Sequence, residues 1–137
     1  MTTQELTDIG FLNVGFWWPS IRTSGRIEPQ VVACDRDTPN VLYAFVVNDL
    51  VMYIGETERP LSRRFTSYSN PGMSDNGSRT DRRICRQVAH HMSRGNRVHI
   101  YVLVRDEECP GSECFGPGER RSMEQYLIRE HRPEWNH

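Results

Sequence analysis

Two tyrosines stand ten residues apart in the stretch VLYAFVVNDLVMYIGETERPLSRRF, residues 41–65, and two arginines follow them. A phenol has an ordinary pKa near 10, so Tyr43 or Tyr53 takes a proton from water efficiently only where a nearby cation lowers that pKa. Arg64 supplies such a cation, and its planar guanidinium grips a phosphate through two hydrogen bonds. Hydrolysis of a phosphodiester needs a nucleophilic water, charge relief on the phosphate and help for the leaving oxygen. These residue types suit that reaction.

Two short apolar runs position these tyrosines. Residues 41–47 and 50–55 are rich in β-branched and aromatic side chains, and they flank an Asn-Asp pair that favours a tight turn. Alternation along a strand puts Tyr43 on one face of the first strand, and it puts Tyr53 on the same face as Val51 in the second. The two runs are predicted to form a hairpin that carries both tyrosines on one face.

Helical spacing dominates much of the remaining sequence. A proline in the first turn and periodic apolar residues predict a helix over residues 58–68, in which Arg64 and Tyr68 lie one above the other. Two further helices are predicted over residues 81–95 and 119–133, and a third strand over residues 98–104. The predicted class is α+β, with the element order β-β-α-α-β-α.

An aromatic-rich extension of residues 1–38 is predicted to pack on a core domain of residues 39–137, with a turn signal, DTPN, at the boundary. Its aromatic residues have two interpretations. Phe16, Trp17 and Trp18 either cover one side of the sheet, which helps a small domain to close its core, or form a platform on which bases stack. We expect the first.

Charge is unevenly distributed along the 137 residues, whose formal net charge is −1. Residues 59–97 hold nine arginines and only two aspartates, whereas residues 98–137 are acidic overall. The chain has no lysine, so every basic side chain is a guanidinium suited to phosphate, although a codon bias of the genome explains the missing lysine equally well. A weak net charge argues against a protein that coats nucleic acid by bulk attraction.

The cysteines and the apolar runs indicate in which cellular compartment the protein is found. Four cysteines without a CxxC pair are interpreted as free thiols: Cys34, Cys85, Cys109 and Cys114. The alternative is a zinc site that combines two of them with histidines: Cys109, Cys114, His90, His91 and His99. No apolar run approaches the roughly 20 residues that span a bilayer, and the polar residues 1–10 lack the basic and apolar regions typical of a signal peptide. We expect a cytoplasmic protein without a membrane partner.

The ordered residues resemble the GIY-YIG nuclease superfamily. The second signature triplet, YIG, is intact at residues 53–55, while residues 41–43 keep only the tyrosine of the first. The resemblance covers about residues 40–136, and six positions match in order: Tyr43, Tyr53, Arg64, Tyr68, Glu124 and Asn136. It implies a three-stranded antiparallel sheet flanked by helices, and a DNA endonuclease that uses a single Mg²⁺ or Mn²⁺ ion and no small-molecule cofactor.

Each matched position has an expected role. Tyr43 is the expected base and Tyr53 a second, orienting phenol, while Arg64 clamps the phosphate and Tyr68 is its hydrogen-bonding partner. Glu124 is the expected metal ligand, since one carboxylate suits an Mg²⁺ ion that keeps most of its waters. Asn136 is expected to fix the local geometry. The substrate is expected to contact the loop at residues 69–80 and five arginines: Arg63, Arg79, Arg82, Arg83 and Arg86.

Two positions depart from the pattern of the superfamily's excision-repair members. Glu56 stands where some relatives carry a lysine, and its carboxylate repels phosphate unless Arg59 or Arg63 pairs with it. The spacing from Tyr53 to Arg64 is similar to that of restriction endonucleases in the superfamily, which favours a restriction or defence nuclease.

Several alternatives remain at the level of sequence. The alternative to an endonuclease is a catalytically inactive nucleic-acid-binding module or a subunit of a larger repair complex. RNA is an alternative substrate, because nothing in the motif reads a 2′-hydroxyl. Cleavage of both DNA strands favours a homodimer, with Trp17 and Trp18 as a candidate contact.

Overall fold

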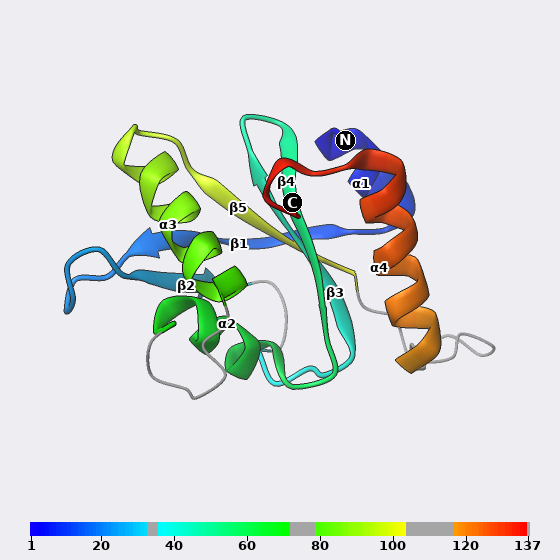
Figure 1. Ribbon diagram of the computed structural model, residues 1–137, viewed down its shortest axis with the longest axis horizontal. Coiled ribbons are helices and arrows are strands. Elements are labelled where there is room, and N and C mark those ends of the chain that lie inside the picture. Colours follow the sequence, from blue (N-terminus) through cyan, green and yellow to red (C-terminus); the bar gives the residue numbers. More distant parts are fainter. Residues whose placement is uncertain (33–35, 72–78, 104–116, 137) are drawn as a thin grey trace.

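Five strands form one sheet in the computed structural model, which describes residues 1–32, 36–71, 79–103 and 117–136. The strand order is β2-β1-β5-β3-β4, and neighbouring strands are antiparallel throughout (Figure 1). The strands are β1 (Leu12–Pro19), β2 (Ile27–Val31), β3 (Val41–Val47), β4 (Leu50–Thr57) and β5 (Val98–Leu103). The α+β class is confirmed.

The prediction of a three-stranded sheet is wrong, because the N-terminal region adds two strands. The three expected strands are β3, β4 and β5, and they lie side by side. β1 then pairs with the other edge of β5, from Leu12 opposite Val102 to Phe16 opposite His99. Without β1, that edge of β5 would leave a row of backbone N–H and C=O groups unpaired. The N-terminal aromatic segment therefore extends the sheet instead of lying over it.

A tight hairpin joins β3 to β4, as predicted. Its turn residues Asn48 and Asp49 have φ values of 50° and 67°, which is the left-handed backbone that two-residue hairpin turns require. The pairing register shifts after Phe45, where Met52 is an extra residue on β4. This bulge turns Met52 towards the face that carries Tyr53 and leaves Val51 on the opposite face. The expectation that Val51 shares a face with Tyr53 is thus wrong.

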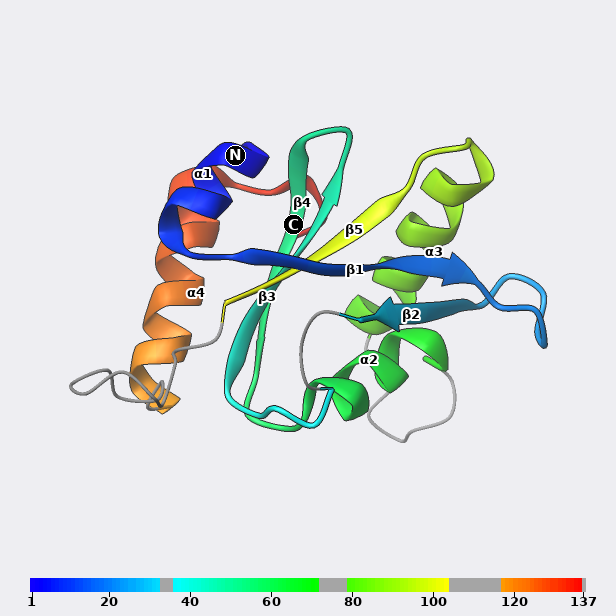
Figure 2. The ribbon, with the colours of Figure 1, turned by 180° about the vertical axis from the view of Figure 1, so that it is seen from behind.

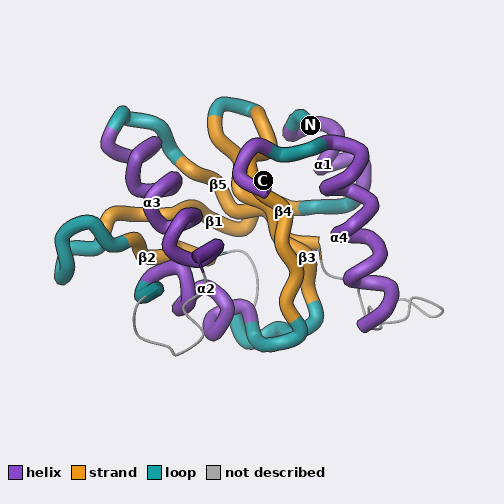
Figure 3. The backbone as a smooth tube through the Cα atoms, viewed as in Figure 1, coloured by secondary structure: helices purple, strands orange, loops and turns teal. Residues whose placement is uncertain are grey.

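Helices cover both faces of the sheet. α2 (Leu61–Ser69) and α3 (Arg79–Ser93) pack on the face that carries the tyrosines, while α1 (Thr3–Ile9) and α4 (Pro117–His131) pack on the other. Figure 2 shows α1 beside α4, and Figure 3 shows the helices on either side of the strands. The apolar core is therefore split into two clusters by the sheet.

The tryptophans of β1 lie on opposite faces of the sheet. Trp17 is 1% exposed and packs between Phe45 and Phe65, so it is neither a stacking platform nor a surface contact for a second copy. Trp18 is 45% exposed, with Arg97 near its ring. None of the described helices is long and apolar enough to cross a membrane.

Candidate active site

Three tyrosines and one arginine meet between the β3–β4 hairpin and α2. The Tyr43 hydroxyl lies 2.6 Å from the Tyr68 hydroxyl, which donates to the Tyr53 hydroxyl over 3.3 Å. Arg64 donates from Nε to Tyr43 at 3.1 Å and from Nη2 to Tyr68 at 2.8 Å. Its guanidinium carbon also lies 4.3 Å from the centre of the Tyr68 ring. The structure thus brings together four residues that the sequence pattern selected.

The glycine of the YIG triplet leaves the space that Tyr43 occupies. Gly55 is opposite Tyr43 in the β3–β4 ladder. A Cβ atom at Gly55 would lie 2.5 Å from the Tyr43 ring carbon Cζ and 2.6 Å from the hydroxyl oxygen. Because Tyr43 is fully buried in a packed core, its ring has little room to move aside. Gly55 is therefore required for the packing that aims Tyr43 at Arg64.

Asp81 anchors the same arginine from α3. Its Oδ1 accepts a hydrogen bond from Arg64 Nη1 at 3.1 Å, and the aspartate is only 4% exposed. A buried carboxylate costs free energy unless it is paired, so this contact with Arg64 fixes both groups. In the sequence analysis Asp81 was one of the two aspartates among nine arginines in residues 59–97, and no role in the site was predicted for it. The available signal was an acid in the first turn of an otherwise basic helix.

Burial keeps the three phenols protonated. Desolvation by burial raises the pKa of Tyr43, and its effect outweighs the charge of Arg64, which lowers that pKa. The pKa of Tyr53 is also raised by burial, and that of Tyr68 is held well above its ordinary value by the same cause. Tyr43 and Tyr68 are fully buried, whereas Tyr53 is 7% exposed. Tyr53 is thus the phenol of the cluster that solvent can reach.

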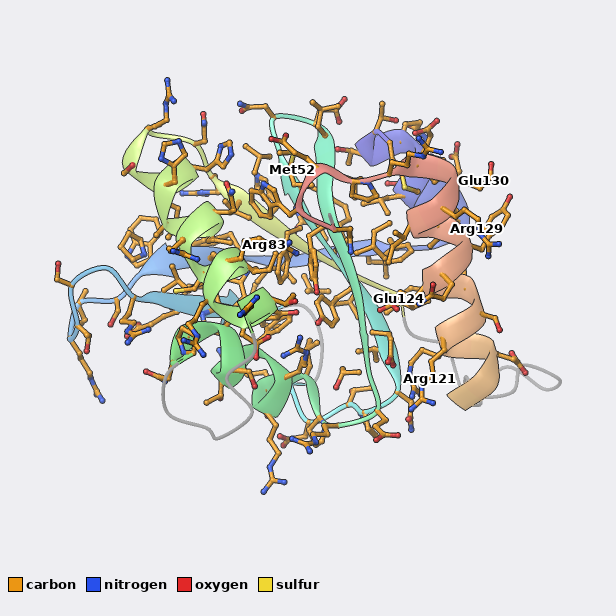
Figure 4. All side chains as sticks on the ribbon, in the orientation of Figure 1. Met52, Arg83, Arg121, Glu124, Arg129 and Glu130 are labelled. Atoms are coloured by element: carbon orange, nitrogen blue, oxygen red, sulfur yellow. The ribbon has the colours of Figure 1, made fainter. Side chains whose placement is uncertain are left out.

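Glu124 approaches this cluster from α4. Its half-buried side chain extends from the helix towards β4, away from Arg129 and Glu130 (Figure 4). Burial first, and the neighbouring Glu56 carboxylate second, raise the pKa of Glu124 to about 7. The backbone of Glu56 and the charges of Arg64 and Arg120 act in the opposite direction and lower that pKa. The negative charge of Glu124 also raises the pKa of Tyr53, after the larger effect of burial.

A divalent cation fits the Glu124 carboxylate. Both causes that raise its pKa disfavour the negative charge, and a bound cation would offset them. Among the described residues, no group of three or more histidine, cysteine or acidic side chains is arranged to hold a metal. A single carboxylate suits an ion that keeps most of its water ligands, such as Mg²⁺. The cysteines of the alternative zinc site, Cys109 and Cys114, lie outside the described residues.

Asn136 attaches the end of the chain to the free edge of β4. Its Nδ2 donates to the Ile54 carbonyl, and its Oδ1 accepts from the Ile54 N–H, both at 2.9 Å. The preceding Trp135, in the short helix η1 (Glu134–Asn136), is buried in the core cluster of the tyrosine face. The Asn136 side chain thus takes the place of a strand partner for Ile54, which lies between Tyr53 and Gly55, and both of its hydrogen bonds are to backbone groups.

Glu56 pairs with α4, and not with the arginines that the sequence suggested. Arg120 Nε donates to Glu56 Oε2 at 2.5 Å, while Arg121 Nε lies 3.9 Å from the other carboxylate oxygen. Arg120 is completely buried, which the sequence did not indicate.

Two clefts have residues of the first turn of α3 in their lining, and the smaller one borders the cluster at Arg64. One, of about 320 Å³, is lined by Arg63, Arg64, Asp81 and Glu56 among others. The other, of about 660 Å³, holds the remaining predicted contacts, Arg79, Arg82, Arg83 and Arg86, together with Arg26 from the β1–β2 connection. Sequence analysis missed Arg26. Arg83 also donates to the Trp135 carbonyl at 2.8 Å, so it braces the C-terminal segment as well.

Comparison with known proteins finds likeness in structure alone. No protein-family model and no curated protein matches the sequence. A mutant of bacteriophage T4 EndoII is similar over 99% of this chain and 98% of its own, with a TM-score of 0.73 and 19% identity. The chain has an endonuclease fold. The restriction endonuclease HPY188I, solved in complex with product DNA, is similar over 96% of this chain and 82% of its own, with a TM-score of 0.61 and 14% identity.

At these identities the likeness concerns the fold. Membership of the GIY-YIG superfamily stays a prediction, and so do the roles of the six matched residues.

Proposed function

We propose that the chain is a divalent-metal-dependent DNA endonuclease that hydrolyses phosphodiester bonds at the cluster of Tyr43, Tyr53, Arg64, Tyr68 and Glu124. The observation that carries the proposal is that two buried tyrosines hold Arg64 at the wall of a cleft, while the Glu124 carboxylate of α4 interacts electrostatically with the same arginine. The likeness to two endonuclease structures supports the same activity.

Arg64 is the proposed phosphate clamp. A guanidinium has five N–H donors, and three of them bond Tyr43, Tyr68 and Asp81. The remaining two can donate to phosphate oxygens, and the side chain is 23% exposed, so it is accessible from the cleft. Because the three bonds fix the guanidinium before substrate binds, little side-chain entropy is lost when the phosphate arrives.

Tyr53 is better supported as the proton acceptor than Tyr43, which the sequence favoured. Tyr53 has partial access to solvent, and the charge of Glu124 acts on it, whereas Tyr43 is fully buried. Its hydroxyl continues into a chain through Tyr68 to Tyr43, and Arg64 donates to the two inner members. We propose that Tyr53 takes the proton of the attacking water as a phenolate, and that the inner hydroxyls orient its oxygen. Burial and the charge of Glu124 raise the pKa of Tyr53, so this role requires positive charge at Glu124, which would offset both and lower that pKa.

Glu124 would hold one Mg²⁺ or Mn²⁺ ion, with Asn136 as the residue that fixes β4 beside it. When bound, the ion supplies positive charge to the phosphate and to the leaving oxygen. Substrate phosphates flanking the scissile one would contact Arg63 in the smaller cleft and the arginines of the larger cleft.

The proposed setting is a restriction or defence nuclease in the cytoplasm. The spacing of Tyr53 and Arg64 and the likeness to a restriction endonuclease support this setting. One site cuts one strand, so we include a homodimer for cleavage of both strands, with a contact surface other than buried Trp17.

The experiment is incubation of purified protein with supercoiled plasmid, and separately with single-stranded DNA, with and without Mg²⁺. We expect metal-dependent nicking or linearisation that is lost in Tyr53→Phe and Arg64→Gln. A protein that binds DNA but cuts under none of these conditions would instead be a binding module. Discrete fragments would indicate a sequence-specific enzyme, and diffuse products a nonspecific one.

A further inference from the structure

Arg120 is a buried charge in an unusual position. It lies in the first turn of α4 and has no exposed surface, although arginine is among the residues least often buried unless it is paired. Its three guanidinium nitrogens face three acceptors. Nε donates to Glu56, Nη1 donates to Asn40 Oδ1 at 2.8 Å, and Nη2 lies 4.0 Å from Glu58 Oε2.

These contacts tie α4 to the sheet at two points. Glu56 belongs to β4, and Asn40 immediately precedes β3 with a left-handed φ of 59°. The apolar contacts of α4 are concentrated further along the helix, where Leu127 is its one buried apolar side chain among the described residues. The position of the first half of α4 therefore depends on the guanidinium of Arg120.

Glu124 follows Arg120 by one helical turn on the same face of α4. Residues four apart are neighbours on a helix surface, about 6 Å along the axis. Glu56 connects the two, because its carboxylate accepts from Arg120 and its charge acts on Glu124. Arg120 thus sets the distance of α4 from β4 and also neutralises a carboxylate that would otherwise face Glu124.

We infer that Arg120 is a positioning residue that holds the Glu124 carboxylate in place for a divalent cation by tying α4 to Glu56 and Asn40. The inference rests on the proposed function. It also explains Glu56, which lines the smaller cleft together with Arg63 and Arg64: its carboxylate does not oppose phosphate because Arg120 neutralises it. Residues that orient a metal ligand through hydrogen bonds commonly change metal affinity tenfold to a hundredfold when they are replaced.

The test is direct binding of Mn²⁺ to purified protein, in which the electron paramagnetic resonance signal of free Mn²⁺ measures how much ion is bound. Wild type is compared with Arg120→Gln, Glu124→Gln and a matched control, Arg121→Gln, which removes the same charge from an exposed neighbour. We expect Arg120→Gln to bind Mn²⁺ at least about tenfold more weakly than wild type. Arg121→Gln should change the affinity by less than twofold. The metal concentration for half-maximal DNA cleavage should shift by the same factor.

A double variant separates positioning from general stability. In Glu56→Gln/Arg120→Gln the buried ion pair becomes a neutral pair that can still hydrogen-bond, so Mn²⁺ affinity should return to within about threefold of wild type. This variant also decides the matter if Arg120→Gln alone does not fold, because it leaves no carboxylate of Glu56 without a counter-ion. Assays are made below the unfolding midpoint of each variant.

Two outcomes overturn the inference in different ways. If Glu124→Gln abolishes Mn²⁺ binding while Arg120→Gln binds as wild type, the inference fails and the proposed function stands. If wild type binds no Mn²⁺ and cuts no DNA, the proposed function fails and the inference with it. A double variant that folds but binds Mn²⁺ as poorly as Glu124→Gln would also refute the positioning role.

Discussion

Replacement of Gly55 by alanine should damage both the stability and the site. The new Cβ would lie 2.5 Å from the Tyr43 ring, well inside van der Waals contact, and the ring is enclosed by Phe45, Phe65 and Tyr68. Overpacking of a core typically costs about 1–3 kcal/mol. Displacement of the Tyr43 hydroxyl from Arg64 and Tyr68 adds about 1 kcal/mol or more.

Together these costs give a loss of roughly 2–4 kcal/mol, which for a chain of this length lowers Tm by roughly 7–14 °C. Thermal unfolding by circular dichroism measures the shift, and plasmid cleavage under single-turnover conditions measures the loss of rate. The matched control is Gly118→Ala in α4, where an added Cβ meets nothing within 4 Å. A Gly55→Ala protein with the Tm and cleavage rate of wild type would refute the packing argument.

Three further predictions concern the tyrosine cluster, the chain end and the arginine cleft. Because burial raises the pKa of the clustered phenols, the folded state keeps their protons to higher pH than the unfolded chain does. Their contribution to the free energy of unfolding should therefore be constant below about pH 10 and fall above it. Each phenylalanine variant should flatten the fall, and a flat urea-unfolding profile from pH 9 to 11 would contradict this. Asn136→Ala removes both bonds to Ile54 and should cost about 1–3 kcal/mol in urea unfolding, whereas Asn136→Asp keeps the acceptor and should cost less; equal losses would count against the paired geometry. Arg26→Ala and Arg86→Ala should each weaken the salt dependence of duplex DNA binding, measured in Mg²⁺-free buffer. The slope of log K against log salt concentration should become about 0.9 less steep in each variant. Arg22→Ala, at an exposed residue of the same β1–β2 connection, is the control and should leave the slope unchanged.

Local signals predicted the elements that carry the site. The apolar alternation and the Asn-Asp turn gave the β3–β4 hairpin, and helical spacing put Arg64 one turn before Tyr68. These features depend on residues close in sequence, so one chain is enough to recognise them. The meeting of Tyr43, Tyr53, Arg64 and Tyr68 followed from the same elements once the hairpin packed on α2.

Long-range contacts were not predictable in the same way. β1 joins β5 across more than eighty residues of chain, and nothing in the local pattern distinguishes a segment that pairs from one that covers. Arg120, Asp81 and Arg26 are ordinary surface types whose roles depend on partners from other elements. Met52 changed faces because the bulge inserts one residue, and its sequence position carries no sign of that.

The central claim is that Glu124 is the metal-binding carboxylate of a phosphodiesterase site. The most direct measurement compares single-turnover cleavage of supercoiled plasmid by wild type, Glu124→Gln and Glu130→Gln at several Mg²⁺ concentrations. Both glutamates lie on α4, but only Glu124 extends towards β4, so the pair controls for charge and helix content (Figure 4). We expect Glu124→Gln to lose at least about a hundredfold in rate while it stays folded, with Glu130→Gln close to wild type. Cleavage by Glu124→Gln at the wild-type rate, or equal losses in both variants, would contradict the account.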